Sequence, residues 1–127
     1  MSFGIGEAMR ENTVISLHKF FWAAYVLALV AGSLVPVDMS AAPAQSDKVL
    51  HFLAYGLMVF FWPASWKCSR VSSFWLASGL GLLLEIAQGV LPTGRFMDFW
   101  DVTANAVGAG VGATAALLWS RFTRRAA

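Results

Sequence analysis

Residues 85–105 read EIAQGVLPTGRFMDFWDVTAN, and this stretch decides the fold. It ends one apolar run, breaks at Pro92-Thr-Gly94 and leads into a second apolar run. Its charged and amide side chains are Glu85, Gln88, Arg95, Asp98, Asp101 and Asn105. A charged group near the centre of a bilayer costs about 2.5–3.5 kcal/mol on insertion scales. Polar groups in or beside such apolar segments therefore mark the candidate site.

The composition points to a membrane protein. The chain of 127 residues is long enough for one domain, which we assign to residues 1–127. Its residues are 58% apolar and only 13% charged, whereas about 25% charged is usual in soluble domains. The net charge of +2 is too small to indicate a nucleic-acid partner. The one cysteine, Cys68, excludes an intramolecular disulfide and a cysteine metal cluster.

Four long apolar runs predict an all-α bundle of four transmembrane helices, at about residues 20–36, 48–66, 72–91 and 102–119. Helices of a soluble bundle would carry polar stripes, and these runs do not. Residues 1–18 are mixed and predict a short interfacial lead-in. In an alternative interpretation the first run is a cleaved signal peptide that ends near Ala42-Pro43-Ala44, so the retention of residues 1–44 stays open.

The basic residues predict the orientation of these helices. With four crossings, the amino terminus, the turn at 67–71 and the carboxyl-terminal tail share one side of the membrane. That side holds seven of the nine lysines and arginines, and the other side holds Lys48 and Arg95. Cytoplasmic loops carry an excess of positive residues. We therefore predict that both termini are cytoplasmic, in a bacterial cytoplasmic (inner) membrane.

The polar residues of the last three helices fall at one depth. At 1.5 Å of rise per residue, His51, Glu85, Gln88 and Asn105 all lie in the outer half of the bilayer. They also form stripes at helical spacing: Asp47, His51 and Tyr55; Glu85 and Gln88; Asp98, Asp101 and Asn105, continued by Gly108 and Gly112. Three stripes at matching depth predict a polar cluster that opens outward.

At these residues the chain resembles the VanZ-like family of small integral membrane proteins. The resemblance rests on three motifs in order, which span residues 47–112. They are Asp47-Lys48-x-x-His51-Phe52-x-x-Tyr55-Gly56, then Glu85-x-x-Gln88 followed by Pro92 and Arg95, then Asp98-x-x-Asp101-x-x-x-Asn105-x-x-Gly108. It implies a small multi-pass protein of the cell envelope, and it does not supply a reaction.

The leading functional hypothesis is a non-catalytic protein that binds an anionic, lipid-linked headgroup or cell-wall precursor. Lys48 and Arg95 would grip the anion. The rest of the polar cluster would shape and orient the pocket: Asp47, His51, Tyr55, Glu85, Gln88, Asp98, Asp101 and Asn105. A simpler interpretation makes Glu85 a structural anchor, Asp98 and Asp101 helix caps, and Arg95 their partner.

Two other functions remain as alternatives. One is a hydrolase or transferase acting on the same lipid, with His51 or Glu85 as acid or base. The other is a proton-coupled transporter, which would need a homodimer through Gly108 and Gly112. The sequence predicts no cofactor and no metal. Its one candidate cation site would combine His51, Glu85, Asp98 and Asp101.

Overall fold

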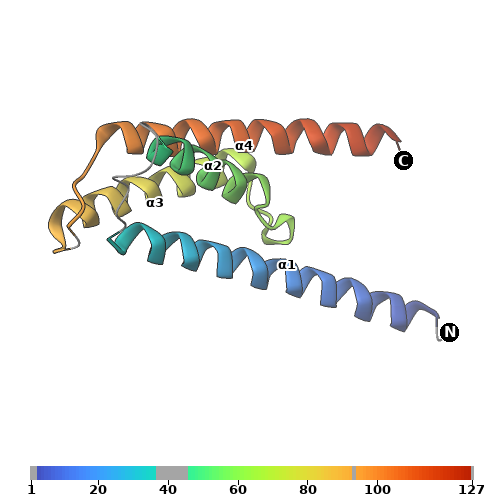
Figure 1. Ribbon diagram of the computed structural model, residues 1–127. Helices are drawn as coiled ribbons and strands as arrows, with labels where there is room; N and C mark the ends of the chain where they lie inside the picture. The colour runs from blue at the N-terminus through green and yellow to red at the C-terminus, as the bar shows by residue number, and fades with distance from the viewer. Residues whose placement is uncertain (1–2, 37–45, 93, 127) are drawn as a thin grey trace.

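The computed structural model describes residues 3–36, 46–92 and 94–126. All the regular structure in these residues is helical. The elements are α1 (Phe3–Leu34), α2 (Ser46–Phe60), a short 3-10 helix η1 (Ala64–Trp66), α3 (Arg70–Val90) and α4 (Phe99–Ala126). Successive helices run in opposite directions, so that the start of α1 and the end of α4 lie at the same end of the bundle (Figure 1). The predicted all-α class is confirmed.

Among the described residues, three helices are long and apolar enough to cross a membrane, judged by length and composition. They are Gly6–Leu34, Arg70–Val90 and Phe99–Arg125. These helices indicate a multi-pass membrane protein, and their exposed apolar side chains are consistent with contact with a lipid bilayer. The fourth predicted crossing corresponds to α2, which is shorter than the sequence suggested.

The predicted helix at 48–66 is wrong at its end, because α2 stops at Phe60. Its 15 residues span only about 22 Å, at 1.5 Å per residue. Pro63 explains the early stop, since proline lacks an amide hydrogen and disfavours helical geometry at the residue before it. The short helix η1 and Lys67, at φ 51°, then turn the chain toward α3.

The first helix is longer than predicted. It begins at Phe3, so the expected lead-in at 1–18 and the expected crossing at 20–36 form one continuous helix. Glu7, Arg10 and Glu11 do not interrupt it, because they are exposed on a helix that packs loosely against the rest of the bundle. The alternative cleavage site at Ala42-Pro43-Ala44 lies outside the described residues.

A row of hydrogen bonds joins α1 to α2. Each runs from a side chain of α1 to a backbone carbonyl at or just beyond α2. The nitrogen–oxygen or oxygen–oxygen distances are 2.9 Å from Trp22 Nε1 to Met58, 2.8 Å from Tyr25 Oη to Ala54, and 2.9 Å from His18 Nε2 to Phe61. Trp22 also contacts the rings of Trp62 and Trp66, at centroid distances of 4.8 and 5.0 Å.

Helices α2 and α4 make the most extensive contact in the bundle. The approach depends on glycine, because a Cβ atom at Gly108 would overlap the Phe52 carbonyl and one at Gly112 would overlap the Gly56 carbonyl. Small residues of this kind let membrane helices approach each other closely. Because α2 of the same chain covers Gly108 and Gly112, the expected homodimer through this pair is not what the structure shows.

Candidate functional site

The polar cluster forms at the end of the bundle where α1 and α3 end and α2 and α4 begin (Figure 1). Asp47, His51 and Tyr55 lie on successive turns of α2. Glu85 and Gln88 lie in the last turns of α3, whereas Asp98, Asp101 and Asn105 lie at the start of α4. Pro92 follows the end of α3, and Gly94, at φ 72°, lets the connector turn back. The structure thus brings together the residues that the sequence placed at one depth.

Lys48 faces α4 and pairs with two aspartates. Its Nζ lies 3.0 Å from Asp98 Oδ2 and 3.4 Å from Asp101 Oδ1. Asp98 also caps α4, because its Oδ1 accepts a hydrogen bond from the Trp100 backbone N–H at 2.8 Å. This hydrogen bond and the bond from Lys48 lower the pKa of Asp98 below its usual value. Asp98 therefore acts as the cap that the simpler interpretation predicted.

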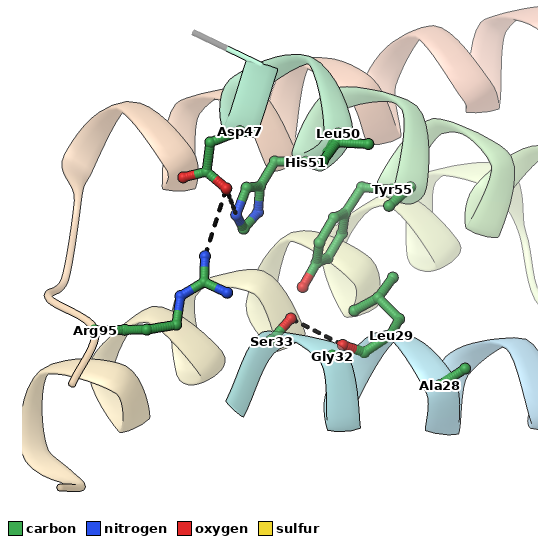
Figure 2. A pocket seen from close by; sticks show the side chains of 10 residues that line it. Ala28, Leu29, Gly32, Ser33, Asp47, Leu50, His51, Tyr55 and Arg95 are labelled. Atoms are coloured by element: carbon green, nitrogen blue, oxygen red, sulfur yellow. Dashed lines mark hydrogen bonds and ion pairs between the residues drawn. The ribbon is translucent and has the colours of Figure 1, made fainter. Parts of the chain in front are cut away.

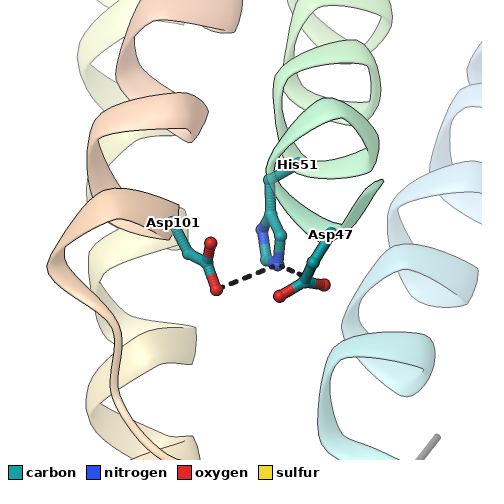
Figure 3. Close-up of side chains that lie close together, drawn as sticks. All are labelled: Asp47, His51 and Asp101. Atoms are coloured by element: carbon teal, nitrogen blue, oxygen red, sulfur yellow. Dashed lines mark ion pairs between the residues drawn. The ribbon is translucent and has the colours of Figure 1, made fainter. Parts of the chain in front are cut away.

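His51 stands between α2 and α4, with a different partner on each ring nitrogen. Its Nδ1–H donates to Asn105 Oδ1 at 2.9 Å. Its Nε2 faces two carboxylates, 3.7 Å from Asp47 Oδ1 and 3.8 Å from Asp101 Oδ2 (Figure 3). The His51 side chain is 11% exposed and that of Asp101 is 5% exposed. The three ligand atoms lie within 4.8 Å of one another.

Glu85 and Gln88 connect the site to the surrounding helices. Glu85 Oε2 accepts the Asp98 backbone N–H at 3.1 Å. Gln88 Nε2 donates to the Ser33 carbonyl of α1 at 2.6 Å. Both side chains are almost completely buried. Glu85 satisfies a backbone N–H before the start of α4, and Gln88 satisfies a backbone carbonyl near the end of α1. The bond made by Glu85 favours its interpretation as a structural anchor.

A cleft of about 220 Å³ opens between α1 and α2 beside this cluster (Figure 2). Its walls are largely apolar, and its polar side chains gather toward one end. The lining residues are Ala28, Leu29, Gly32, Ser33, Asp47, Leu50, His51, Ala54, Tyr55 and Arg95. Arg95 reaches in from the connector before α4, and its Nη2 lies 3.4 Å from Asp47 Oδ1. We call this the α1–α2 cleft.

The predicted site residues divide into two groups. Asp47, His51, Tyr55 and Arg95 line the α1–α2 cleft. The other six hold the helices and the cleft residues in place: Lys48, Glu85, Gln88, Asp98, Asp101 and Asn105. Sequence reasoning missed the contribution of α1, whose Ser33 both lines the cleft and accepts from Gln88. Ser33 is a polar residue near the end of the first apolar run, at the same depth as the cluster, and that position was the available signal.

The comparison with protein families agrees with the motifs. A family model described as VanZ/LLP1 matches residues 6–120, which is nearly the whole chain. Neither a search of curated proteins nor a search of solved structures found a match. The matched range includes the long helix α1 and every residue of the polar cluster. The chain therefore belongs to the VanZ/LLP1 family.

Proposed function

We propose that this protein binds the anionic headgroup of a lipid or of a lipid-linked cell-wall precursor in the α1–α2 cleft. The observation that carries the proposal is the amphipathic lining of that cleft. Leu29, Leu50 and Ala54 supply apolar walls, while Arg95 and His51 supply polar groups. Ligand sites generally combine an apolar lining with a few well-placed polar groups. An acyl or prenyl chain suits these walls, and a phosphate suits the guanidinium of Arg95.

The proposal assigns the gripping role to Arg95 alone. Lys48, the other cationic residue expected to bind the anion, does not line the cleft and pairs with Asp98 and Asp101. Arg95 is at the cleft and contacts Asp47 at 3.4 Å. An incoming phosphate would compete with that aspartate for the guanidinium. Exchange of one acidic partner for another keeps the arginine paired in both states.

The proposal places the cleft on the outer side of a bacterial cytoplasmic membrane, with both termini in the cytoplasm. The seven basic residues near the termini and the 67–71 turn support this orientation. The arrangement of the termini at one end of the bundle agrees with an even number of crossings (Figure 1). The short α2, together with η1, would make the fourth crossing.

A membrane hydrolase or transferase is the second candidate, and His51 is the residue that favours it. His51 lines the cleft, and its Nδ1–H is held by Asn105, as a positioned acid or base requires. The structure gives less support to Glu85, which does not line the cleft and whose Oε2 accepts the Asp98 backbone N–H. The lining of the cleft also contains a hydroxyl, that of Ser33, which donates its hydrogen to the Leu29 carbonyl at 2.9 Å rather than to a base.

The transporter alternative loses support, since it required the Gly108 and Gly112 face that α2 covers.

The test is native mass spectrometry of the protein released from nanodiscs of native lipid. Gly32→Leu adds a side chain to the lining of the cleft, and its Cβ atom meets no obstacle, because nothing lies within 4 Å of a Cβ atom at Gly32. Gly79→Leu on α3 is the matched control, since its Cβ is equally unobstructed and it does not line the cleft. Arg95→Ala removes the cation, with the exposed Arg121→Ala as its control.

We expect an anionic lipid species to remain on the wild type and on both controls, and to be lost from Gly32→Leu and Arg95→Ala. The mass of that species identifies the ligand class. If all five proteins retain the same bulk lipids, the headgroup proposal is wrong. Turnover of the retained lipid that disappears in His51→Gln would instead support the enzyme.

A further inference from the structure

His51 and two aspartates arrange their donor atoms around one point between α2 and α4 (Figure 3). The three residues come from two elements: Asp47 and His51 from the first turns of α2, and Asp101 from the first turn of α4. This set differs from the cation site that the sequence suggested. Glu85 and Asp98 are not part of it, because Glu85 accepts the Asp98 backbone N–H and Asp98 accepts the Trp100 backbone N–H. Asp47 is the additional ligand.

Asn105 fixes which nitrogen of His51 points at the aspartates. In neutral imidazole one nitrogen carries the hydrogen and the other carries a lone pair. Because Nδ1–H donates to Asn105 Oδ1 at 2.9 Å, the lone pair of neutral His51 belongs to Nε2. That lone pair faces Asp47 and Asp101. Histidines that bind metals are usually oriented by such a hydrogen bond from the other ring nitrogen.

The distances fit a shared cation better than they fit hydrogen bonds. The nitrogen–oxygen separations of 3.7 and 3.8 Å exceed the roughly 2.7–3.2 Å of a hydrogen bond. Two ligand atoms that each lie about 2.1 Å from a metal ion are about 3.4 Å apart at a tetrahedral angle. The two His51–aspartate separations exceed that value by only a few tenths of an ångström, and all three donor atoms lie within 4.8 Å of one another.

The charge of the polar cluster points the same way. It holds four carboxyl groups, of Asp47, Glu85, Asp98 and Asp101, and two cationic side chains, Lys48 and Arg95, which pair with the three aspartates. The formal excess is two negative charges in a region where the Glu85 and Asp101 side chains are buried. Unpaired buried charge is costly, and a divalent cation balances this excess.

The neighbouring cations approach the two aspartates in different ways. Lys48 approaches Asp101 through Oδ1, whereas Oδ2 is the oxygen that faces His51. At Asp47 the two contacts share one atom, because Oδ1 faces His51 and also lies 3.4 Å from Arg95 Nη2; the other oxygen of this carboxylate, Oδ2, is in neither of these two contacts. Each aspartate can therefore keep its cationic partner while it contributes an oxygen to a metal ion.

We propose that Asp47 and Asp101, together with Nε2 of His51, form a binding site for a first-row divalent transition metal of the Mn²⁺ or Zn²⁺ type. Imidazole favours such ions over Mg²⁺ and Ca²⁺, and carboxylates accept them. Asn105 is the positioning residue, since it holds the imidazole through Nδ1. The metal would lie next to Arg95 at the α1–α2 cleft. This proposal does not depend on the identity of the ligand in that cleft.

The test uses Mn²⁺ as the probe on the full chain in detergent, purified with a tag that contains no histidine and freed of metal by a chelator. The chain has two histidines, His18 and His51, and His18 lies outside the cluster against the Phe61 carbonyl. His18→Gln is therefore the matched control for His51→Gln. Electron paramagnetic resonance measures the free and bound Mn²⁺ during the titration.

We expect one saturable Mn²⁺ per chain in the wild type and in His18→Gln. In His51→Gln and Asp101→Asn, the affinity for Mn²⁺ should fall by more than 10–100-fold, which is roughly the loss expected when a residue that only hydrogen-bonds to a metal ligand is removed. Spin-echo modulation of the loaded wild type, which needs no variant, should show one imidazole nitrogen bound to Mn²⁺. Absence of saturable binding, binding without that nitrogen signal, or equal affinity in a folded His51→Gln protein would each overturn the proposal.

Discussion

Alanine at Gly108 should destabilise the bundle, although alanine is normally the better helix former. A Cβ atom there would overlap the Phe52 carbonyl, so α2 and α4 must separate by roughly an ångström to restore normal contact distances. Overpacking of this kind costs about 1–3 kcal/mol, and the gain in helix propensity offsets about 1 kcal/mol of it. We expect a net loss of up to about 2 kcal/mol in the free energy of unfolding.

Gly110 provides the control in the same helix. A Cβ atom at Gly110 would lie 3.7 Å from the Phe74 ring, an ordinary contact. Gly110→Ala should therefore stabilise the protein, by about 0.5–1 kcal/mol. Reversible unfolding in mixed micelles of mild detergent and sodium dodecyl sulfate measures both changes. If Gly108→Ala is as stable as Gly110→Ala, the close approach of α2 and α4 does not exist as described.

Two further predictions concern acidic residues that serve backbone groups. Glu85→Gln keeps an oxygen for the Asp98 backbone N–H and should change the free energy of unfolding little. Glu85→Leu leaves that N–H unsatisfied and should cost about 1–3 kcal/mol. Equal losses for the two variants in the same unfolding assay would contradict the role of Glu85 as acceptor for this N–H. Asp98→Asn keeps a cap oxygen for Trp100 and loses the ion pair with Lys48. Because the pKa of Asp98 is lowered in the folded state, its stabilisation is present above the unfolded pKa and disappears as pH falls through the folded value. The difference in melting temperature between wild type and Asp98→Asn should therefore shrink as the pH is lowered from 7 to 3. A difference that stays constant over this range would refute the stabilising role of the Asp98 carboxylate.

The location of the site was predictable from the sequence because helices fix depth and face. A rise of 1.5 Å per residue and a spacing of three to four residues were enough to place His51, Glu85 and Asn105 together. The division of roles was not predictable in the same way. Asp47 and Lys48 are neighbours in the chain, yet Asp47 lines the cleft and Lys48 faces α4. That outcome depends on the rotation of α2 about its axis, which tertiary packing sets.

The boundaries of the helices were harder to predict than their existence. The apolar run continues through Phe61 and Trp62, so hydropathy alone extended α2 to residue 66, and Pro63 was the signal that should have ended it. The start of α1 was predicted too late, because the apolar run begins only at Phe20 whereas the helix begins at Phe3. Its charged residues Glu7, Arg10 and Glu11 are exposed, and helical geometry there does not depend on burial.

The seam between α1 and α2 has a consequence for how this protein can change over evolutionary time. His18, Trp22 and Tyr25 bind carbonyl oxygens, which every amino acid at the α2 positions would provide. Substitutions at the acceptor positions in α2 can therefore accumulate without removing a bond, provided that the helix itself persists. The donors of α1 have no such freedom, since each bond requires its own side chain. At this contact, α1 is therefore constrained in its side chains, whereas α2 is constrained in its backbone geometry.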